Sequence, residues 1–258
     1  MKPRISYLVC GVQRSGSSLL CEALKNTHLA GAPNEYFLCE EEGRWEDAGG
    51  HWAKAHQVTS REQFLRLVFE LGTTPNGVFG AKLMWNYFSY VLRNLRELAE
   101  YEGLTDPALM ATVFSQPRYI WIVRRNKVAQ AVSWAKAALT GIYAWPKGQA
   151  PARGQEPAFD FTFIDNLYKL VLQGEAGWAG FFQACGVAPF QVIYEELADA
   201  YEQTALDVLG YLGISHPADL AFGERRLQQQ ADALNEQWAA RYIERKQEMG
   251  EPVSREHC

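Results

Sequence analysis

The sequence of 258 residues has few cysteines and no long apolar run, and each shortage excludes a class of protein. Its five cysteines are widely spaced and form no Cys-x-x-Cys pair, which argues against a disulfide framework and against a zinc site. No apolar run approaches the ~20 residues that span a membrane, and the chain does not open with a secretory signal. We therefore expect a cytoplasmic protein with reduced thiols, for which any association with a membrane is peripheral.

Positive charge is not in excess either, since 25 Lys and Arg residues face 30 Asp and Glu residues and leave a net charge of −5. Proteins that bind nucleic acid usually neutralise many phosphates with a basic face. We therefore expect no nucleic acid as a partner, while a local basic pocket stays open. The hydrophobic share of 48% is ordinary for a globular protein, and the length favours a single domain over residues 1–258.

A short apolar run near the N-terminus leads into a glycine-containing loop. Residues 5–10 predict a buried strand, the loop reads Gly11-Val12-Gln13-Arg14-Ser15-Gly16, and a helix begins at Ser17 or Ser18. The glycine spacing is that of a phosphate-binding loop, but Ser17 stands where a nucleotide triphosphatase has lysine. Backbone amides and hydroxyls at a helix N-terminus favour an anion. The alternative is a simple turn with a serine cap.

Three further apolar runs, at residues 78–85, 118–123 and 190–194, alternate with helical patterns that include a long one at 161–185. This alternation predicts an α/β fold in which a central parallel sheet is flanked by helices. Ligands of such sheets bind beyond the carboxyl ends of the strands. The run at 118–123 ends in Arg124-Arg125 instead of the aspartate that helps to hold magnesium, so magnesium-dependent phosphoryl transfer is disfavoured.

Arg125 and Ser133 are the residues that could bind a second phosphate. They are eight positions apart, one at the end of a predicted strand and the other two turns into the next helix. A guanidinium can donate bidentate, charge-assisted hydrogen bonds to a phosphate, and a serine hydroxyl can donate one further hydrogen bond. Taken alone, an arginine after a strand is more often a solvated surface charge.

Together these segments resemble the PAPS-dependent sulfotransferases, and most closely the bacterial trehalose 2-sulfotransferase (Stf-type) family. The resemblance covers most of the chain and implies a P-loop-like sulfotransferase fold, a single sulfotransferase domain and a homodimer. It rests on Gln13-Arg14-Ser15-Gly16-Ser17-Ser18-Leu19-Leu20, Gly31-Ala32-Pro33-Asn34-Glu35-Tyr36-Phe37, Pro75 to Trp85, Val123-Arg124-Arg125 with Gln130 to Trp134, and Gln230-Ala231-Asp232 with Trp238 and Arg241-Tyr242.

The resemblance also implies the co-substrate and the residues that bind it. The donor is 3′-phosphoadenosine 5′-phosphosulfate (PAPS), and no metal is implied. Arg125 and Ser133 are implied at its 3′-phosphate. The 5′-phosphosulfate is implied to bind the loop residues Gln13, Arg14, Ser15, Gly16, Ser17, Ser18 and Leu19.

On the acceptor side, the family places a glutamate in the segment that Glu35 matches, so we expect Glu35 to be the general base, unless it is an ordinary loop carboxylate. Lys82 is either a cation near the transferring group or a charge at a strand end. Trp85 is the family-motif tryptophan that could stack on a sugar, as could Trp45, Trp52 and Trp145, although core packing is the commoner role of tryptophan.

We therefore predict a carbohydrate sulfotransferase that moves a sulfuryl group from PAPS to a hydroxyl of a trehalose-like disaccharide, a glycolipid or a polysaccharide by in-line displacement. A P-loop small-molecule kinase and a catalytically silent nucleotide-binding protein are the alternatives. The segment 144–157, rich in Pro, Gly and Ala, is a candidate lid.

Overall fold

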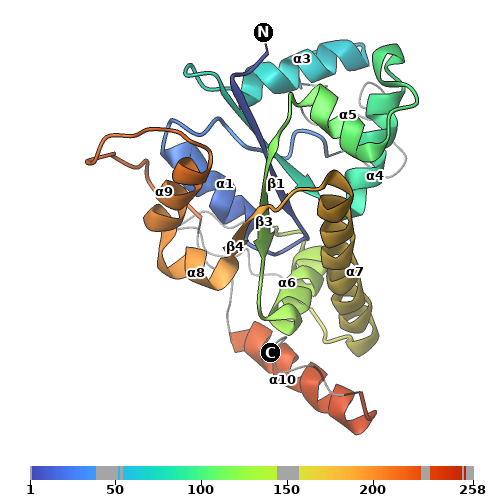
Figure 1. The fold of residues 1–258 in the computed structure, drawn as a ribbon. Helices are drawn as coiled ribbons and strands as arrows, with labels where there is room; N and C mark the ends of the chain where they lie inside the picture. Colours follow the sequence, from blue (N-terminus) through green and yellow to red (C-terminus); the bar gives the residue numbers. More distant parts are fainter. Residues whose placement is uncertain are drawn as a thin grey trace.

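Four parallel strands form the centre of the computed structural model, which describes residues 2–38, 52, 55–143, 157–227, 233–251 and 253. The strand order is β2-β1-β3-β4, and β1 therefore has neighbours on both sides (Figure 1). The strands are β1 (Ile5–Gly11), β2 (Val78–Met84), β3 (Arg118–Val123) and β4 (Phe190–Ile193). The predicted parallel sheet is confirmed. Most of the expected lid, residues 144–156, and both Trp45 and Trp145 lie outside the described residues.

The carboxyl ends of the strands meet at one edge of the sheet. Gly11, the last residue of β1, pairs with Met84, the last residue of β2, while β3 and β4 end together at the pair Val123 and Ile193. The chain runs from β1 to β2 on one side and later to β3 on the other, so the loop after β1 lies at the point where the strand order reverses. Ligands of open α/β sheets bind at such a point.

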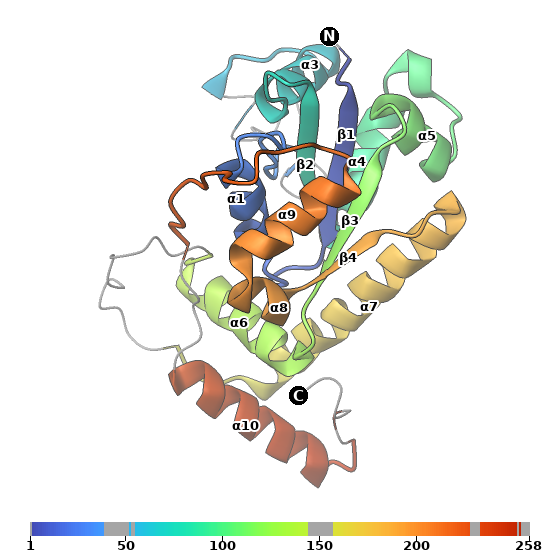
Figure 2. The same ribbon diagram turned by 60° about the vertical axis from the view of Figure 1, so that its left-hand side comes forward.

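Two helical layers cover the sheet because its strands are apolar on both faces. One face packs against the apolar sides of α3, α4, α5 and α7, and the other packs against α1, α8 and α9 (Figures 1 and 2). The first layer consists of α3 (Arg61–Gly72), α4 (Trp85–Arg96), the short 3-10 helix η1 (Ala99–Tyr101), α5 (Asp106–Val113) and α7 (Phe161–Cys185). The second consists of α1 (Ser17–Asn26), α8 (Tyr194–Asp199) and α9 (Tyr201–Tyr211).

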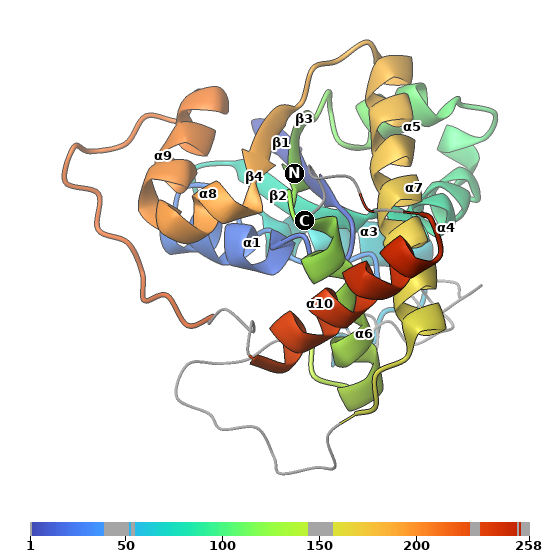
Figure 3. The same ribbon diagram turned by 90° about the horizontal axis from the view of Figure 1, so that it is seen from below.

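A third apolar cluster joins α6 (Lys127–Thr140) and α10 (Ala233–Glu248) to α7, at the end of the molecule where the strands finish (Figure 3). Trp238 and Tyr242 of α10 are fully buried in it, so this charged helix is part of the core and not only a surface helix. The Tyr242 hydroxyl donates to Asp165 Oδ1 at 2.8 Å, and Lys246 Nζ lies 3.3 Å from the same oxygen.

Asp165 of α7 and its partners Tyr242 and Lys246 of α10 form a polar cluster, which we call the polar anchor. Burial alone would raise the pKa of Asp165, but hydrogen bonds from Lys169, Tyr242 and Lys246 outweigh it and hold the pKa below its ordinary value. The fold therefore fixes α6, the helix that carries Ser133, between α7 and α10.

Candidate active site

The loop between β1 and α1 contains two residues of positive φ and leaves the first turn of α1 without a side-chain cap. Gly16 has φ 90° and Arg14 has φ 63°, and no side chain caps the first turn of α1. The first amides of a helix have no partner within the helix, so this end offers several N–H donors. Because Gly16 is the N-cap residue and no serine hydroxyl bonds back to the helix, the alternative of a serine-capped turn is not what the chain forms.

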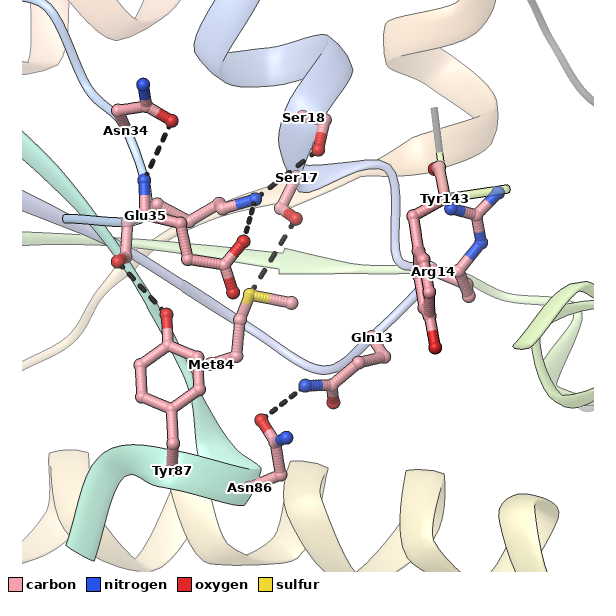
Figure 4. Close-up of polar contacts among 11 residues, drawn as sticks. Gln13, Arg14, Ser17, Ser18, Asn34, Glu35, Met84, Asn86, Tyr87 and Tyr143 are labelled. Carbon is pink, nitrogen blue, oxygen red and sulfur yellow. Dashed lines mark hydrogen bonds and ion pairs between the residues drawn. The ribbon is translucent and has the colours of Figure 1, made fainter. Parts of the chain in front are cut away.

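Two helices hold this loop in place through its backbone carbonyls. Trp178 Nε1 of α7 donates to the carbonyl of Gly11 at 2.8 Å, and Gln130 Nε2 of α6 donates to the carbonyl of Gln13 at 2.8 Å. The side chain of Gln13 in turn donates to Asn86 Oδ1 at the start of α4 (Figure 4). Both Trp178 and Gln130 are fully buried, so the loop is fixed by the core and not by solvent-exposed contacts.

Glu35 lies beside the loop through an ion pair with Lys82. Lys82 Nζ is 2.8 Å from Glu35 Oε2 and 3.3 Å from Ser18 Oγ, so one ammonium contacts both the expected base and the first turn of α1. The Lys82 side chain is 9% exposed and lies inside β2, not at its end, while the Glu35 side chain is 26% exposed. Lys82 is therefore not an exposed charge at a strand end, while its role as a cation near the transferring group stays a prediction.

Backbone hydrogen bonds explain why Glu35 reaches this position. The amide of Lys82 donates to the carbonyl of Asn34 at 2.9 Å, which ties the segment before Glu35 to the open edge of β2. The Asn34 side chain accepts the amide of Glu35 at 2.9 Å, and the Tyr36 hydroxyl donates to the carbonyl of Ala32 at 2.6 Å. The segment is therefore rigid without being helical or part of the sheet.

Tyr87 of α4 closes the other side of Glu35. Its hydroxyl donates weakly to the carbonyl of Lys82 at 3.4 Å. Burial, and then the charge of the Glu35 carboxylate, raise the pKa of Tyr87 well above its ordinary value. Tyr87 therefore remains a neutral hydroxyl beside Glu35 at physiological pH.

Arg14 extends from the loop toward α6. Its Nε donates to Ser133 Oγ at 3.0 Å, and Nη1 donates to the carbonyl of Tyr143. Burial, followed by the like charge of Arg124, lowers the pKa of Arg14 from its ordinary value. The structure thus joins Ser133 to the loop through Arg14, whereas the sequence led us to expect Ser133 to act together with Arg125.

Arg125 contacts helix α8. Its guanidinium pairs with Glu196 on α8, and its side chain is 54% exposed. Arg124 is the arginine that faces the loop: its Cζ lies 4.8 Å from the centre of the Tyr194 ring. A methyl group on Gly16 would overlap Cδ2 of that same ring. Sequence reasoning named neither Arg124 nor Tyr194 as a site residue, although the arginine pair at a strand end was a signal for the first.

Trp85 is packed between the core and a large cavity. Its ring lies edge-on to Trp178 with centroids 5.3 Å apart, and a methyl group on Gly177 would overlap it. It also lines a cavity of about 1200 Å³ between α4 and α7, together with Gln13, Asn86 and Trp134. The cavity therefore opens beside the loop, with polar amides at that end and aromatic rings along it.

Within the described part of the chain, no cluster of His, Cys, Asp and Glu could hold a metal ion. The same residues include no helix with the length and apolarity needed to cross a bilayer. The candidate site consists of the N-terminus of α1, Arg14, Arg124, Lys82 and Glu35.

A parallel sheet with a loop and an uncapped helix N-terminus at its switch point, and a carboxylate beside that loop, is an arrangement typical of α/β group-transfer enzymes. The chain belongs to the Stf0 sulphotransferase family, whose sequence model matches residues 6–245. The predicted family is thus confirmed, and the protein is a transferase of the sulfotransferase type. The family also confirms the P-loop-like sulfotransferase fold.

Two curated relatives match nearly the whole chain. The trehalose 2-sulfotransferase of Mycolicibacterium smegmatis is 29% identical in an alignment 269 positions long, which covers 96% of this chain and 98% of the relative. The trehalose 2-sulfotransferase of Mycobacterium tuberculosis is 28% identical in an alignment 273 positions long, which covers 96% of this chain and 97% of the relative.

Two of the solved structures that resemble the chain are the following. A sulfotransferase from Alicyclobacillus acidocaldarius has a TM-score of 0.48 and 13% identity, with 97% of each chain covered. The sulfotransferase domain of the Synechococcus olefin synthase has a TM-score of 0.43 and 14% identity, with 93% of this chain and 95% of that chain covered.

Proposed function

We propose that the protein transfers a sulfuryl group from PAPS to a hydroxyl of a sugar, with Glu35 as the general base. The acceptor class is a trehalose-like disaccharide, free or as part of a glycolipid or polysaccharide, because both curated relatives are named trehalose 2-sulfotransferase. The loop 13–19 holds the phosphosulfate, and Arg125 and Ser133 bind the 3′-phosphate.

The reaction is an in-line displacement at sulfur. A bond forms between the acceptor oxygen and sulfur while the bond from sulfur to the bridging oxygen of the phosphosulfate breaks, and its electron pair goes to that oxygen. Glu35 takes the proton of the acceptor hydroxyl. The products are the sulfate ester and adenosine 3′,5′-bisphosphate. Arg14 and the amides of the loop stabilise the charge that develops on the leaving phosphate.

The observation that carries this proposal is the contact of Lys82 with both Glu35 and Ser18, at 2.8 and 3.3 Å. This contact supports the proposal, because one side chain joins Glu35 to the first turn of α1. A base that takes the acceptor proton has to lie that close to the transferred group, since positioning supplies much of the rate of such reactions.

Calorimetry separates this function from a small-molecule kinase. The proposal predicts that adenosine 3′,5′-bisphosphate binds in the presence of a chelator and that ATP with magnesium binds far more weakly. Tight binding of ATP with magnesium, and none of the bisphosphate, would identify a kinase instead.

A panel of acceptors addresses the sugar. Trehalose, a trehalose glycolipid and a polysaccharide are incubated with labelled donor, and the sulfated products are located by mass spectrometry. The cavity beside Trp85 supports a sugar, because aromatic rings and amides are the usual lining of carbohydrate sites. Equal, slow sulfation of every hydroxyl compound offered would argue against a dedicated sugar site.

We also infer that the protein acts in the cytoplasm as a homodimer. The unpaired thiols of Cys10, Cys21 and Cys185 support a reducing compartment. Light scattering tests the oligomeric state, and a monomer at micromolar concentration would refute the dimer.

A further inference from the structure

The cavity beside Trp85 extends well beyond the loop between β1 and α1. Its lining follows α4 from Trp85, the first residue of the helix, to Arg96, the last. A helix of 12 residues is about 18 Å long. The cavity volume of about 1200 Å³ also exceeds the ~300 to 1000 Å³ that is usual for a site that binds one small molecule. A disaccharide bound at the loop would therefore leave part of the cavity unfilled.

The helices α4 and α7 form the walls of this cavity and lead away from the carboxyl edge of the sheet (Figure 1). Trp85 meets α7 at Gly177, where an added methyl group would overlap its ring. Further along both helices, Phe88 meets Phe181 with ring centroids 5.0 Å apart. Asp106, the first residue of α5, also lines the cavity. The cavity thus has one end at the loop and the other at α5.

The end at the loop carries hydrogen-bonding groups. Gln13 and Asn86 bond to each other and line this end, and so does Tyr87, which lies beside Glu35 (Figure 4). Gln13 Oε1 is buried and has no hydrogen-bond partner among the residues that the structure describes. Buried polar atoms are nearly always paired in native proteins, and a hydroxyl of a bound sugar would satisfy this one. Such a sugar would lie next to the expected base.

The middle of the cavity offers mainly apolar surface. It is lined by the buried side chains of Phe88 and Leu92 on α4, and by Gly180 and Phe181 on α7, while Ser89 adds an exposed hydroxyl. A glycine within a helix has no side chain, and its amide and carbonyl bond within the helix. Sugar hydroxyls that leave water need new hydrogen-bond partners. This stretch therefore suits a hydrocarbon chain better than further sugar units.

Two exposed leucines add to this apolar surface. Leu38 and Leu170 line the cavity, and they are 51% and 48% exposed. Leu38 comes three residues after Glu35, and Leu170 lies on α7. Single exposed leucines are ordinary, but apolar side chains that gather at a cavity mark a binding surface. A ligand with an apolar chain would gain free energy by covering them.

We propose that the sugar acceptor carries an apolar chain, such as a fatty-acyl group, and that this chain lies between α4 and α7 along Gly180. This inference rests on the proposed function, because it presumes that a sugar hydroxyl is sulfated beside Glu35. Gln13 and Asn86 bind the sugar, and the chain leaves water for the apolar part of the cavity. An acylated sugar is therefore a better acceptor than the same sugar without the chain.

The test compares acceptors that differ only in the chain. Trehalose and its butyryl, octanoyl and dodecanoyl monoesters are incubated with labelled PAPS below the concentrations at which the esters form micelles, and kcat/KM is measured for each. We expect kcat/KM to rise about two- to fourfold for each CH₂ group that enters the cavity and then to level off. Trehalose extended by two glucose units should stay within about threefold of trehalose.

Two variants of α7 block the cavity at different depths. A methyl group on Gly180 would meet nothing within 4 Å among the described residues, so Gly180→Phe places a ring in the cavity without a clash at Cβ. Ala184 lines the cavity one helical turn, about 5 Å, further from the loop. The rise with chain length should therefore stop at a shorter chain in Gly180→Phe than in Ala184→Phe.

Gly210 supplies the matched control. It lies in α9, in the helical layer on the other face of the sheet, and an added methyl group there would likewise meet nothing within 4 Å among the described residues. Gly210→Phe should keep the wild-type rise with chain length. Calorimetric titration with adenosine 3′,5′-bisphosphate establishes that each variant is folded, because the nucleotide binds at the loop and not in the blocked part of the cavity.

Four results would overturn the inference. Equal kcat/KM for trehalose and all its esters would show that the chain has no site, and the proposed function would stand. A gain for the extended sugar in place of the esters would identify an oligosaccharide as the occupant. If Gly180→Phe and Ala184→Phe keep the wild-type rise, or lower all acceptors by the same factor, the chain does not lie along α7. If no sugar is sulfated, the proposed function fails and the inference fails with it.

Discussion

Gly16 is the residue at which the loop between β1 and α1 is most tightly constrained. Replacing it with alanine gives a quantitative test of the loop geometry. Its φ of 90° is a conformation that L-residues rarely adopt, and an added methyl group would overlap Cδ2 of Tyr194 and lie 3.1 Å from Cε2. The conformational strain costs about 1 to 2 kcal/mol. Overpacking against the ring adds about 1 to 3 kcal/mol. We expect Gly16→Ala to lower the free energy of unfolding by about 2 to 5 kcal/mol.

Gly103 supplies the matched control. It has φ 75°, and an added methyl group would meet nothing within 4 Å. Gly103→Ala therefore measures the conformational strain together with the effect of alanine on the unfolded chain. The difference between the two alanine variants isolates the overlap with Tyr194, which we expect to be about 1 to 3 kcal/mol.

Urea denaturation followed by tryptophan fluorescence gives these free energies, and a double-mutant cycle with Tyr194→Ala identifies the ring as the cause. In the Tyr194→Ala background the cost of Gly16→Ala should fall to that of Gly103→Ala. Additive costs, within about 0.5 kcal/mol, would refute the argument that the Tyr194 ring fixes the loop at Gly16.

Three other predictions concern the base, the loop support and the polar anchor. Glu35→Gln should lower turnover by about 10²- to 10⁴-fold without weakening the binding of adenosine 3′,5′-bisphosphate in calorimetry. The control variant Glu102→Gln replaces an exposed carboxylate and should change neither quantity. Wild-type turnover of Glu35→Gln would refute the assignment of Glu35 as the base. Trp178→Phe should lower the free energy of unfolding by about 1 to 3 kcal/mol in urea titrations, because the carbonyl of Gly11 loses its buried donor; no loss would contradict that bond. The native pKa of Asp165 is depressed, so its contribution to stability is present above its unfolded pKa of about 3.9 and is lost as pH falls through the lower native value. Asp165→Asn should therefore lower the urea midpoint at pH 7, with a difference that shrinks below about pH 4; a difference that grows in acid would reverse the assigned sign.

The sheet could be predicted from the sequence because each strand is a short apolar run with a clear boundary. The expected runs at 5–10, 78–85, 118–123 and 190–194 differ from the observed strands by at most one residue at an end. The short helix α5 was missed because it is apolar on all sides and has almost no helical period. Its cap, Thr105 before Asp106-Pro107, was the available signal.

The site was predictable where its residues lie on one segment and less so where tertiary packing decides. The loop 13–19 and Glu35 were named from motifs. That Lys82 is the residue that joins them follows only from the pairing of β1 with β2, which places its ammonium between α1 and Glu35. That Ser133 contacts Arg14, while Arg125 pairs with Glu196, depends on side-chain directions that tertiary packing decides.

The most direct test of the central claim is a stoichiometric assay of donor turnover. Purified protein is incubated with sulfur-labelled PAPS and trehalose in the presence of a chelator, and both products are quantified. We predict one equivalent of sulfated sugar for each equivalent of adenosine 3′,5′-bisphosphate released. Tight binding of the bisphosphate without transfer to any sugar offered would contradict the account and would identify a nucleotide-binding protein that has lost catalysis.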